Sequence, residues 1–138
     1  MAEVGASPGG ESSRLLSEFP GMQYFGIFLA DVPTSGGESR EGLYQMEKQL
    51  LAAHGGRAAL HFTTSEAAAA AVPPRALDLA VVDVTGTEED AARDLQLWEA
   101  RVKPGGILAG HGFSPETPAG VRAVCNHRFG NNIQMGFG

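Results

Sequence analysis

A doubly wound, mainly parallel α/β sheet of about six strands, with helices on both faces, is the fold that this sequence predicts. Short apolar segments alternate along the chain with segments of helical periodicity, which is the pattern of a parallel sheet with crossover helices. The 138 residues suit one domain, at roughly 100–200 residues per domain. Hydrophobic residues make up 43% and charged residues 19%, so there is enough apolar material for one buried core.

The expected strands are short apolar runs that end at a turn or at an acidic residue, and they span residues 2–4, 23–30, 58–62, 77–82, 107–109 and 132–137. The run 23–30 is almost entirely apolar, as a strand covered on both faces should be. Lys103 to Gly106 is expected to turn the chain into the fifth strand.

Helices are expected between these strands, at residues 11–18, 39–54, 67–71, after Thr87 and from Thr117 to about Arg128. Ser65 is the expected N-cap of the third helix, and Thr87 with Asp90 forms the expected capping box of the fourth. The inward-facing positions are expected to be apolar: Leu15, Leu16, Phe19, Leu43, Met46, Leu50, Leu51, Ala91, Leu95 and Trp98.

Charge and composition exclude several classes of function. The net charge is −6 and Lys48 and Lys103 are the two lysines, so the chain lacks the basic face that nucleic-acid binding requires. Apolar runs stay well short of the ~20 residues of a membrane helix, and the N-terminus lacks a signal-peptide layout. Cys125 is the single cysteine, which excludes an internal disulfide and a cysteine-based zinc site. We therefore expect a cytoplasmic protein without nucleic-acid or membrane partners.

The two ends suggest that residues 1–138 form one domain truncated at both ends. The first expected strand, residues 2–4, has three residues before the Gly5 turn, whereas a buried strand usually has about five or six. The last expected strand also reaches the end of the sequence.

Three features fall at the carboxyl ends of expected strands, where open α/β sheets bind ligands. A glycine-rich turn begins at Gly5 and includes Gly9 and Gly10, Asp31 follows the second strand, and Asp83 follows the fourth. Asp31 lies about twenty residues beyond these glycines, a spacing that suits a carboxylate bound to ribose hydroxyls. Each acid can also serve a turn or a helix cap, but the three together favour an adenosine-containing ligand.

Several segments then resemble one known family. Residues 2–12 resemble the first motif, and residues 77–83 the fourth strand, of class I S-adenosylmethionine-dependent methyltransferases. Residues 94–98, 102–111 and 120–124 resemble a small-molecule branch that includes sugar O-methyltransferases. The resemblance covers almost the whole chain in order. It implies a Rossmann-like methyltransferase fold that lacks the usual last antiparallel strand, S-adenosylmethionine as cofactor, and O-methylation of a small hydroxylated acceptor.

The resemblance also implies roles for particular residues. Glu3, Gly5, Ala6, Ser7 and Gly9 would form the site of the cofactor's methionine part. Asp31 would hold the ribose, Thr64 and Ser65 would border the adenine, and Asp83 would face the amino group or the reaction centre.

Two departures from the family pattern concern catalysis. Asp83 is followed by Val84-Thr85-Gly86 instead of Gly-x-His, and Gly110-His111 by Gly112-Phe113 instead of Asp-Tyr. One carboxylate and one histidine suit a hard cation poorly, so we expect no catalytic metal. His111 is the candidate general base, because histidine titrates near neutrality, although a loop hydrogen bond explains it equally well. The alternatives are a methyltransferase-like binding domain without catalysis and a nicotinamide-dependent oxidoreductase, which the absence of G-x-G-x-x-G disfavours.

Overall fold

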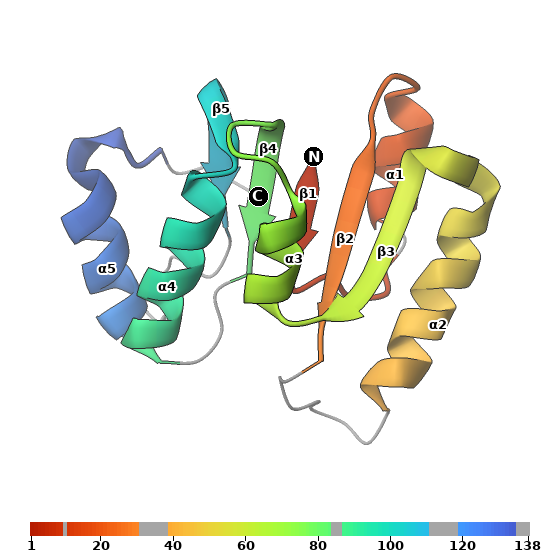
Figure 1. The fold of residues 1–138 in the computed structure, drawn as a ribbon, viewed down its shortest axis with the longest axis horizontal. Coiled ribbons are helices and arrows are strands. Elements are labelled where there is room, and N and C mark those ends of the chain that lie inside the picture. The colour runs from red at the N-terminus through yellow and green to blue at the C-terminus, as the bar shows by residue number, and fades with distance from the viewer. Residues whose placement is uncertain (10, 31–38, 84–86, 111–118, 135–138) are drawn as a thin grey trace.

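A computed structural model describes residues 1–9, 11–30, 39–83, 87–110 and 119–134, and it contains one parallel sheet (Figure 1). The strands are β1 (Ala2–Val4), β2 (Tyr24–Leu29), β3 (Ala58–Thr63), β4 (Leu77–Val82) and β5 (Val102–Ala109). The helices are α1 (Glu11–Glu18), α2 (Arg40–Leu51), α3 (Ser65–Ala71), α4 (Glu88–Glu99) and α5 (Ala119–Phe129), with 3-10 turns η1 (Ala52–Arg57) and η2 (Gly130–Asn132).

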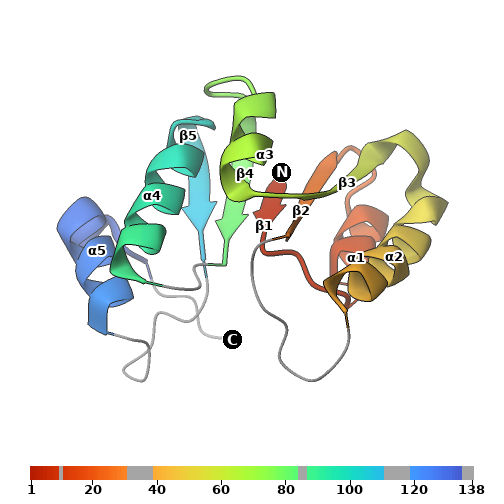
Figure 2. The same cartoon turned by 60° about the horizontal axis from the view of Figure 1, so that its bottom comes forward.

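The five strands of the described residues lie in the order β3-β2-β1-β4-β5, and every pair is parallel. The chain winds outward from β1 through β2 to β3, then crosses to β4 and winds outward in the other direction. Accordingly α1 and α2 cover one face of the sheet, and α3, α4 and α5 lie on the other (Figures 1 and 2). The predicted doubly wound α/β fold is confirmed. Its winding reverses between β1 and β4, and ligands of such sheets bind outside the carboxyl ends of the strands at that point.

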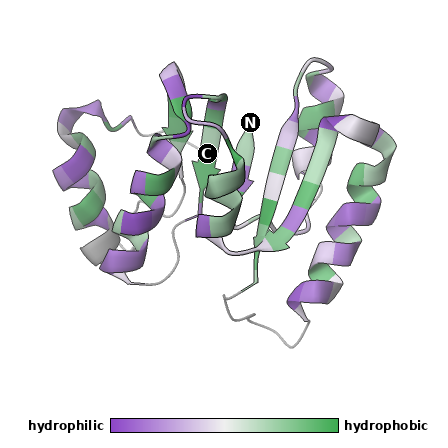
Figure 3. Ribbon diagram, viewed as in Figure 1, coloured by the Kyte–Doolittle hydropathy of each residue, from purple (hydrophilic) through white to green (hydrophobic). Residues whose placement is uncertain are grey.

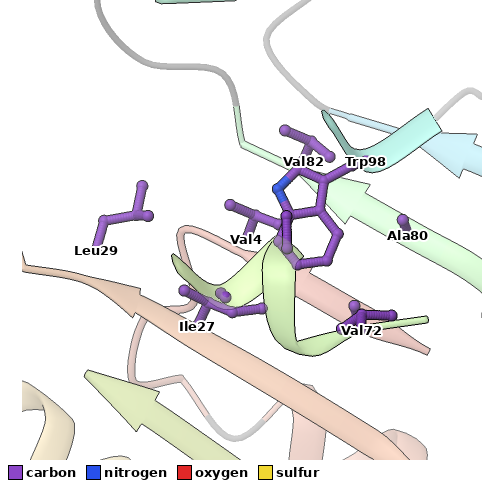
Figure 4. Packing of buried hydrophobic residues seen from close by; sticks show 10 residues of the cluster. Val4, Ile27, Leu29, Val72, Ala80, Val82 and Trp98 are labelled. Carbon is purple, nitrogen blue, oxygen red and sulfur yellow. The ribbon is translucent and has the colours of Figure 1, made fainter. Parts of the chain in front are cut away.

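The main apolar core lies between the sheet and the pair α3 and α4 (Figure 4). Trp98 of α4 is fully buried there and packs among side chains of the central strands, including Val4, Ile27 and Val82. Successive side chains of a strand point to opposite sides of the sheet, so alternate residues of each strand form this apolar face. The predicted inward positions Ala91, Leu95 and Trp98 are all buried, although only Trp98 belongs to this cluster.

Helix caps explain where two helices begin. In α4 the side chain of Thr87 accepts from the backbone of Asp90, and the Asp90 carboxylate accepts from the backbone of Thr87, so the predicted capping box is confirmed. In α3 the prediction was one residue late. The hydroxyl of Thr64 accepts from Ala67 N at 3.3 Å, and Ser65 is the first helical residue.

The fifth strand is longer than the sequence predicted. It begins at Val102 instead of residue 107, because Lys103 to Gly106 stay beside β4 through an irregular register and do not form a separate turn. Gly105, with φ of +80°, permits this irregularity. The expected sixth strand at 132–137 is wrong at its start, since Asn132 ends η2 and residues 133–134 are not in a strand. Residues 135–138 lie outside the described part.

The apolar pattern also misjudged parts of the first two helices. In α2, Met46 and Leu50 are 52% and 48% exposed, whereas Glu47 is 1% exposed. Phe19, just after α1, is 55% exposed, while Leu16 is fully buried as expected. Figure 3 shows the mixture of hydrophilic and hydrophobic residues along α2. The helix therefore turns a polar residue toward the sheet and leaves apolar residues in water.

Candidate functional site

A cavity of about 160 Å³ lies at the carboxyl ends of β1, β2 and β4, beside the point where the winding reverses. Its described lining comes from the turn after β1, the end of β2, the start of α2 and the residue after β4: Gly5, Ala6, Ser7, Pro8, Phe28, Leu29, Arg40, Leu43 and Asp83. Three predicted features of the first turn (Gly5, Ala6 and Ser7) and one predicted acid (Asp83) thus meet in one hollow.

Close packing between the ends of β1 and β4 requires a glycine at position 5. Gly5 has φ of +86°, and a Cβ atom there would lie 2.9 Å from Cβ of Asp83. The amides of Gly5 and Ala6 both donate to the carbonyl of Ile27, at 3.1 and 2.9 Å. The turn is therefore fixed against β2 while it approaches Asp83, and only a residue without a side chain fits.

Asp83 is held at the cavity by the sheet itself. Its amide donates to the carbonyl of Val4 at 2.9 Å, which extends the pairing of β4 with β1 by one residue. The side chain is half-buried and lines the cavity. The sheet thus carries a carboxylate to the edge where a ligand would bind.

Arg40 brings a positive charge to the same cavity from the first turn of α2. Ser39 caps this helix by accepting from Gly42 N at 3.0 Å, which fixes where the helix begins. The Nε atom of Arg40 is buried and has no hydrogen-bond partner among the described residues. Phe28, Leu29 and Leu43 supply apolar walls. The described lining of the cavity therefore combines one acid and one base with apolar surface, the mixture typical of small-molecule sites.

Glu3 belongs to a buried polar cluster beneath α1 and α2, which also contains Ser12, Tyr24 and Glu47. The phenol of Tyr24 donates to Oε2 of Glu3 at 2.7 Å, and the hydroxyl of Ser12 donates to Glu47. Burial, and then the neighbouring Glu3 carboxylate, raise the pKa of Tyr24 far above its ordinary value, so the phenol remains a donor. Glu3 is not among the described residues that line the cavity, and its role in cofactor binding stays a prediction.

Thr64 and Ser65 lie at the carboxyl end of β3, where both side chains have partners within the protein. Thr64 caps α3, and the hydroxyl of Ser65 accepts from Nε1 of Trp98 at 3.0 Å. Ser65 also hydrogen-bonds Asp94, whose pKa is raised chiefly because the carboxyl group is half-buried. These contacts join α3 to α4. Neither residue is among the described residues that line the cavity, so their place beside an adenine stays a prediction.

Two predicted site residues, Asp31 and His111, lie outside the described residues. Gly9 is described, exposed and not part of the cavity lining. Sequence reasoning missed Arg40, Phe28 and Leu43 as site residues. Their signal was topological, since the end of β2 and the start of α2 must lie at the same edge as the Gly5 turn.

The described part of the chain holds neither of two other kinds of site. No group of three or more His, Cys, Asp or Glu side chains there could hold a metal ion. None of the described helices is both long enough and apolar enough to cross a membrane. A second hollow, of about 540 Å³, lies between α4 and α5 and has Glu88, His127 and Arg128 in its lining. None of the predicted site residues is in its described lining.

Comparison with known proteins identifies the family of this chain. The model of a family described as "Methyltransferase domain" matches residues 3–113, from β1 to just beyond β5. No curated protein matches the chain. The matched segment contains the Gly5 turn, Arg40 and Asp83, and it spans most of the 138 residues. The predicted resemblance to class I methyltransferases is confirmed at the level of the family, whereas the small-molecule branch stays a prediction; the chain belongs to the methyltransferase domain family, of class I.

Proposed function

We propose that this protein is an S-adenosylmethionine-dependent methyltransferase that methylates an oxygen atom of a small hydroxylated molecule. The observation that carries the proposal is the cavity at the reversal point of the sheet, where the Gly5 turn and Asp83 meet. Membership of the methyltransferase domain family supports transfer of a methyl group over hydride transfer to a nicotinamide. A cytoplasmic location, in which Cys125 stays a free thiol, is part of the proposal.

The residues at the cavity fit S-adenosylmethionine chemically. The Gly5 turn gives a ligand close access to backbone, because no side chain intervenes at that position. Asp83 offers a carboxylate to the cofactor's positive groups, and Arg40 offers a cation to its negative group. Asp31 remains the proposed partner of the ribose hydroxyls.

The chemistry asks little of the protein beyond alignment. Bound S-adenosylmethionine supplies a methyl group on a sulfonium, and displacement forms a carbon–oxygen bond while the carbon–sulfur bond breaks and its electron pair stays on sulfur. The chain must hold the acceptor in line, exclude water and accept the hydroxyl proton. We assign proton removal to His111 and the electrostatic environment of the reaction centre to Asp83.

Charge and resemblance support a small acceptor. The net charge of −6 disfavours a nucleic-acid phosphate backbone as substrate. Residues 94–111, which resemble the small-molecule branch, include the end of α4 and all of β5.

Calorimetry with S-adenosylhomocysteine tests the cofactor assignment. We expect binding by the wild type, and a loss of roughly 1.5–3 kcal/mol for Asp31→Ala, the range for hydrogen bonds to charged groups. Asp83→Ala should also weaken binding. Asp78→Ala is the matched control. Asp78 lies on β4, the strand that ends just before Asp83, but its side chain is exposed and paired with Lys103. Wild type that does not bind would reject the cofactor, and unchanged binding by Asp31→Ala would reject the ribose assignment.

A binding domain without catalysis is the second candidate, because the Gly-x-His and Asp-Tyr elements expected after Asp83 and His111 are replaced. Transfer of a labelled methyl group to hydroxylated acceptors separates the two candidates. Transfer that His111→Ala abolishes supports the enzyme, whereas cofactor binding without transfer to any acceptor supports the binding domain.

A further inference from the structure

Arg40 brings a buried, unpartnered donor and a positive charge to the amino end of a helix. It is the first residue of α2, and the amino end of a helix carries a partial positive charge that favours acidic side chains. Its Nε atom is buried, with no hydrogen-bond partner in the described part of the chain. A buried donor without a partner costs free energy that a bound acceptor would recover.

The cavity that Arg40 lines is too small for a whole nucleoside cofactor. It measures about 160 Å³, whereas sites that enclose drug-sized ligands are roughly 300–1,000 Å³. It therefore suits one end of such a molecule. Among the described residues, its lining carries one guanidinium, from Arg40, and one carboxylate, from Asp83, and it has apolar walls from Phe28, Leu29 and Leu43.

This pair of charges matches only one end of S-adenosylmethionine. The amino-acid end carries an ammonium and a carboxylate on the same carbon, whereas the adenosine end carries no charge. We propose that Arg40 is the residue that binds the carboxylate of the cofactor's amino-acid end, with the ammonium directed to Asp83. This inference rests on the proposed function and adds to it a specificity residue that sequence reasoning did not identify.

Arginine is suited to this role for geometric reasons. The planar guanidinium can donate two parallel hydrogen bonds to a carboxylate, and it stays charged in a partly buried site. A lysine would keep the charge but not the paired geometry. The helix N-terminus beside it adds to the attraction for an anion. The same features give no advantage to a neutral ligand.

The test compares two ligands that differ in the amino-acid end. S-adenosylhomocysteine has the ammonium and carboxylate, and 5′-methylthioadenosine lacks both. Calorimetry would measure the binding of each to the wild type, Arg40→Gln and Arg40→Lys. Lys48→Gln is the matched control, because it removes one positive charge from the same helix at an exposed residue outside the cavity lining. Thermal denaturation of each variant reports whether it folds.

We expect Arg40→Gln to weaken S-adenosylhomocysteine binding by about ten- to a hundredfold, as for loss of a charged hydrogen bond. Binding of 5′-methylthioadenosine should not change, Arg40→Lys should recover part of the loss, and Lys48→Gln should bind both ligands as the wild type does. Equal weakening of both ligands by Arg40→Gln, or no weakening of either, would overturn the inference while leaving the proposed function intact. Failure of the wild type to bind S-adenosylhomocysteine would overturn the proposed function and this inference with it.

Discussion

The two faces of the sheet are built on different principles. The face under α3 and α4 is apolar, with Trp98 packed among valines, alanines and an isoleucine from the strands. The face under α1 and α2 contains the buried polar cluster of Glu3, Ser12, Tyr24 and Glu47 beside a smaller apolar group around Leu16. Buried polar groups on the first face are few among the described residues, with Ser65 accepting from Nε1 of Trp98, whereas on the second face a connected set of polar side chains is buried.

Helix α2 shows why this difference matters for function. Arg40 and Glu47 are seven residues apart, so both fall on the same side of the helix. Arg40 lines the cavity and Glu47 is fully buried in the polar cluster. The apolar face contains the larger cluster of buried hydrophobic residues, and the polar face carries Arg40 to the ligand edge. Mutations on the two faces should therefore have different signatures.

The largest effect is expected at Trp98, on the apolar face. Trp98→Ala removes a fully buried ring and should lower the free energy of unfolding by about 3–5 kcal/mol, because it leaves a cavity in the core. Urea denaturation followed by circular dichroism measures this change.

Leu50→Ala is the control for Trp98→Ala, since Leu50 is an apolar residue that is 48% exposed on the opposite face. Its effect should be small by comparison, as for most surface substitutions. Comparable losses for the two variants would contradict the division between faces.

A smaller loss of stability is expected in the polar cluster, and a second substitution there should reverse most of it. Ser12→Ala removes the donor to Glu47 and leaves a buried carboxylate without it, which should cost about 1–3 kcal/mol. Adding Glu47→Met should restore most of this loss, because replacing both partners by apolar groups removes the unpaired polar group. The same denaturation measurement applies to both variants.

No such rescue should occur in the apolar core, where substitutions remove packing and no pair is left unmatched. If Ser12→Ala with Glu47→Met is as unstable as Ser12→Ala alone, the two residues do not act as a pair, and the cluster behaves as ordinary packing.

The contrast between faces also explains how much of the molecule the sequence could predict. The positions of the first four strands, the parallel winding and the buried side of α4 follow from apolar periodicity, which is why Ala91, Leu95 and Trp98 were placed correctly. The inward side of α2 could not be found in this way. Periodicity favoured Met46 and Leu50, but tertiary packing buries Glu47 instead, because Ser12 across the α1–α2 interface supplies a donor.

The candidate site likewise contains residues that the sequence predicted and others that it did not. Gly5 and Asp83 were predictable, because a glycine turn and an acid that end neighbouring strands must meet at one edge. Arg40 was not, since a single arginine in a helix looks like any other surface cation. Its significance depends on the burial of one nitrogen atom and on the cavity beside it, and neither is encoded in a local pattern.

The smallest expected effect concerns a polar residue within the apolar face. Burial raises the pKa of Asp94, so the folded protein binds that proton more tightly than the unfolded chain does. The stability that this group contributes is present at low pH and is lost as the pH rises above the ordinary aspartate range, about 4. Asp94→Asn does not ionise, so its stability relative to the wild type should increase between acidic and neutral pH.

Asp90, one turn earlier in α4, is the natural control because its pKa shifts in the other direction. Hydrogen bonds from the Thr87 backbone and hydroxyl, and then from Arg93, lower the pKa of Asp90. Its contribution to stability is therefore present near neutrality and is lost as the pH falls. Asp90→Asn should destabilise the protein at neutral pH more than at acidic pH, the opposite trend to Asp94→Asn. Thermal denaturation from acidic to neutral pH would measure both trends, and parallel behaviour of the two variants would show that burial does not distinguish these neighbouring carboxyl groups.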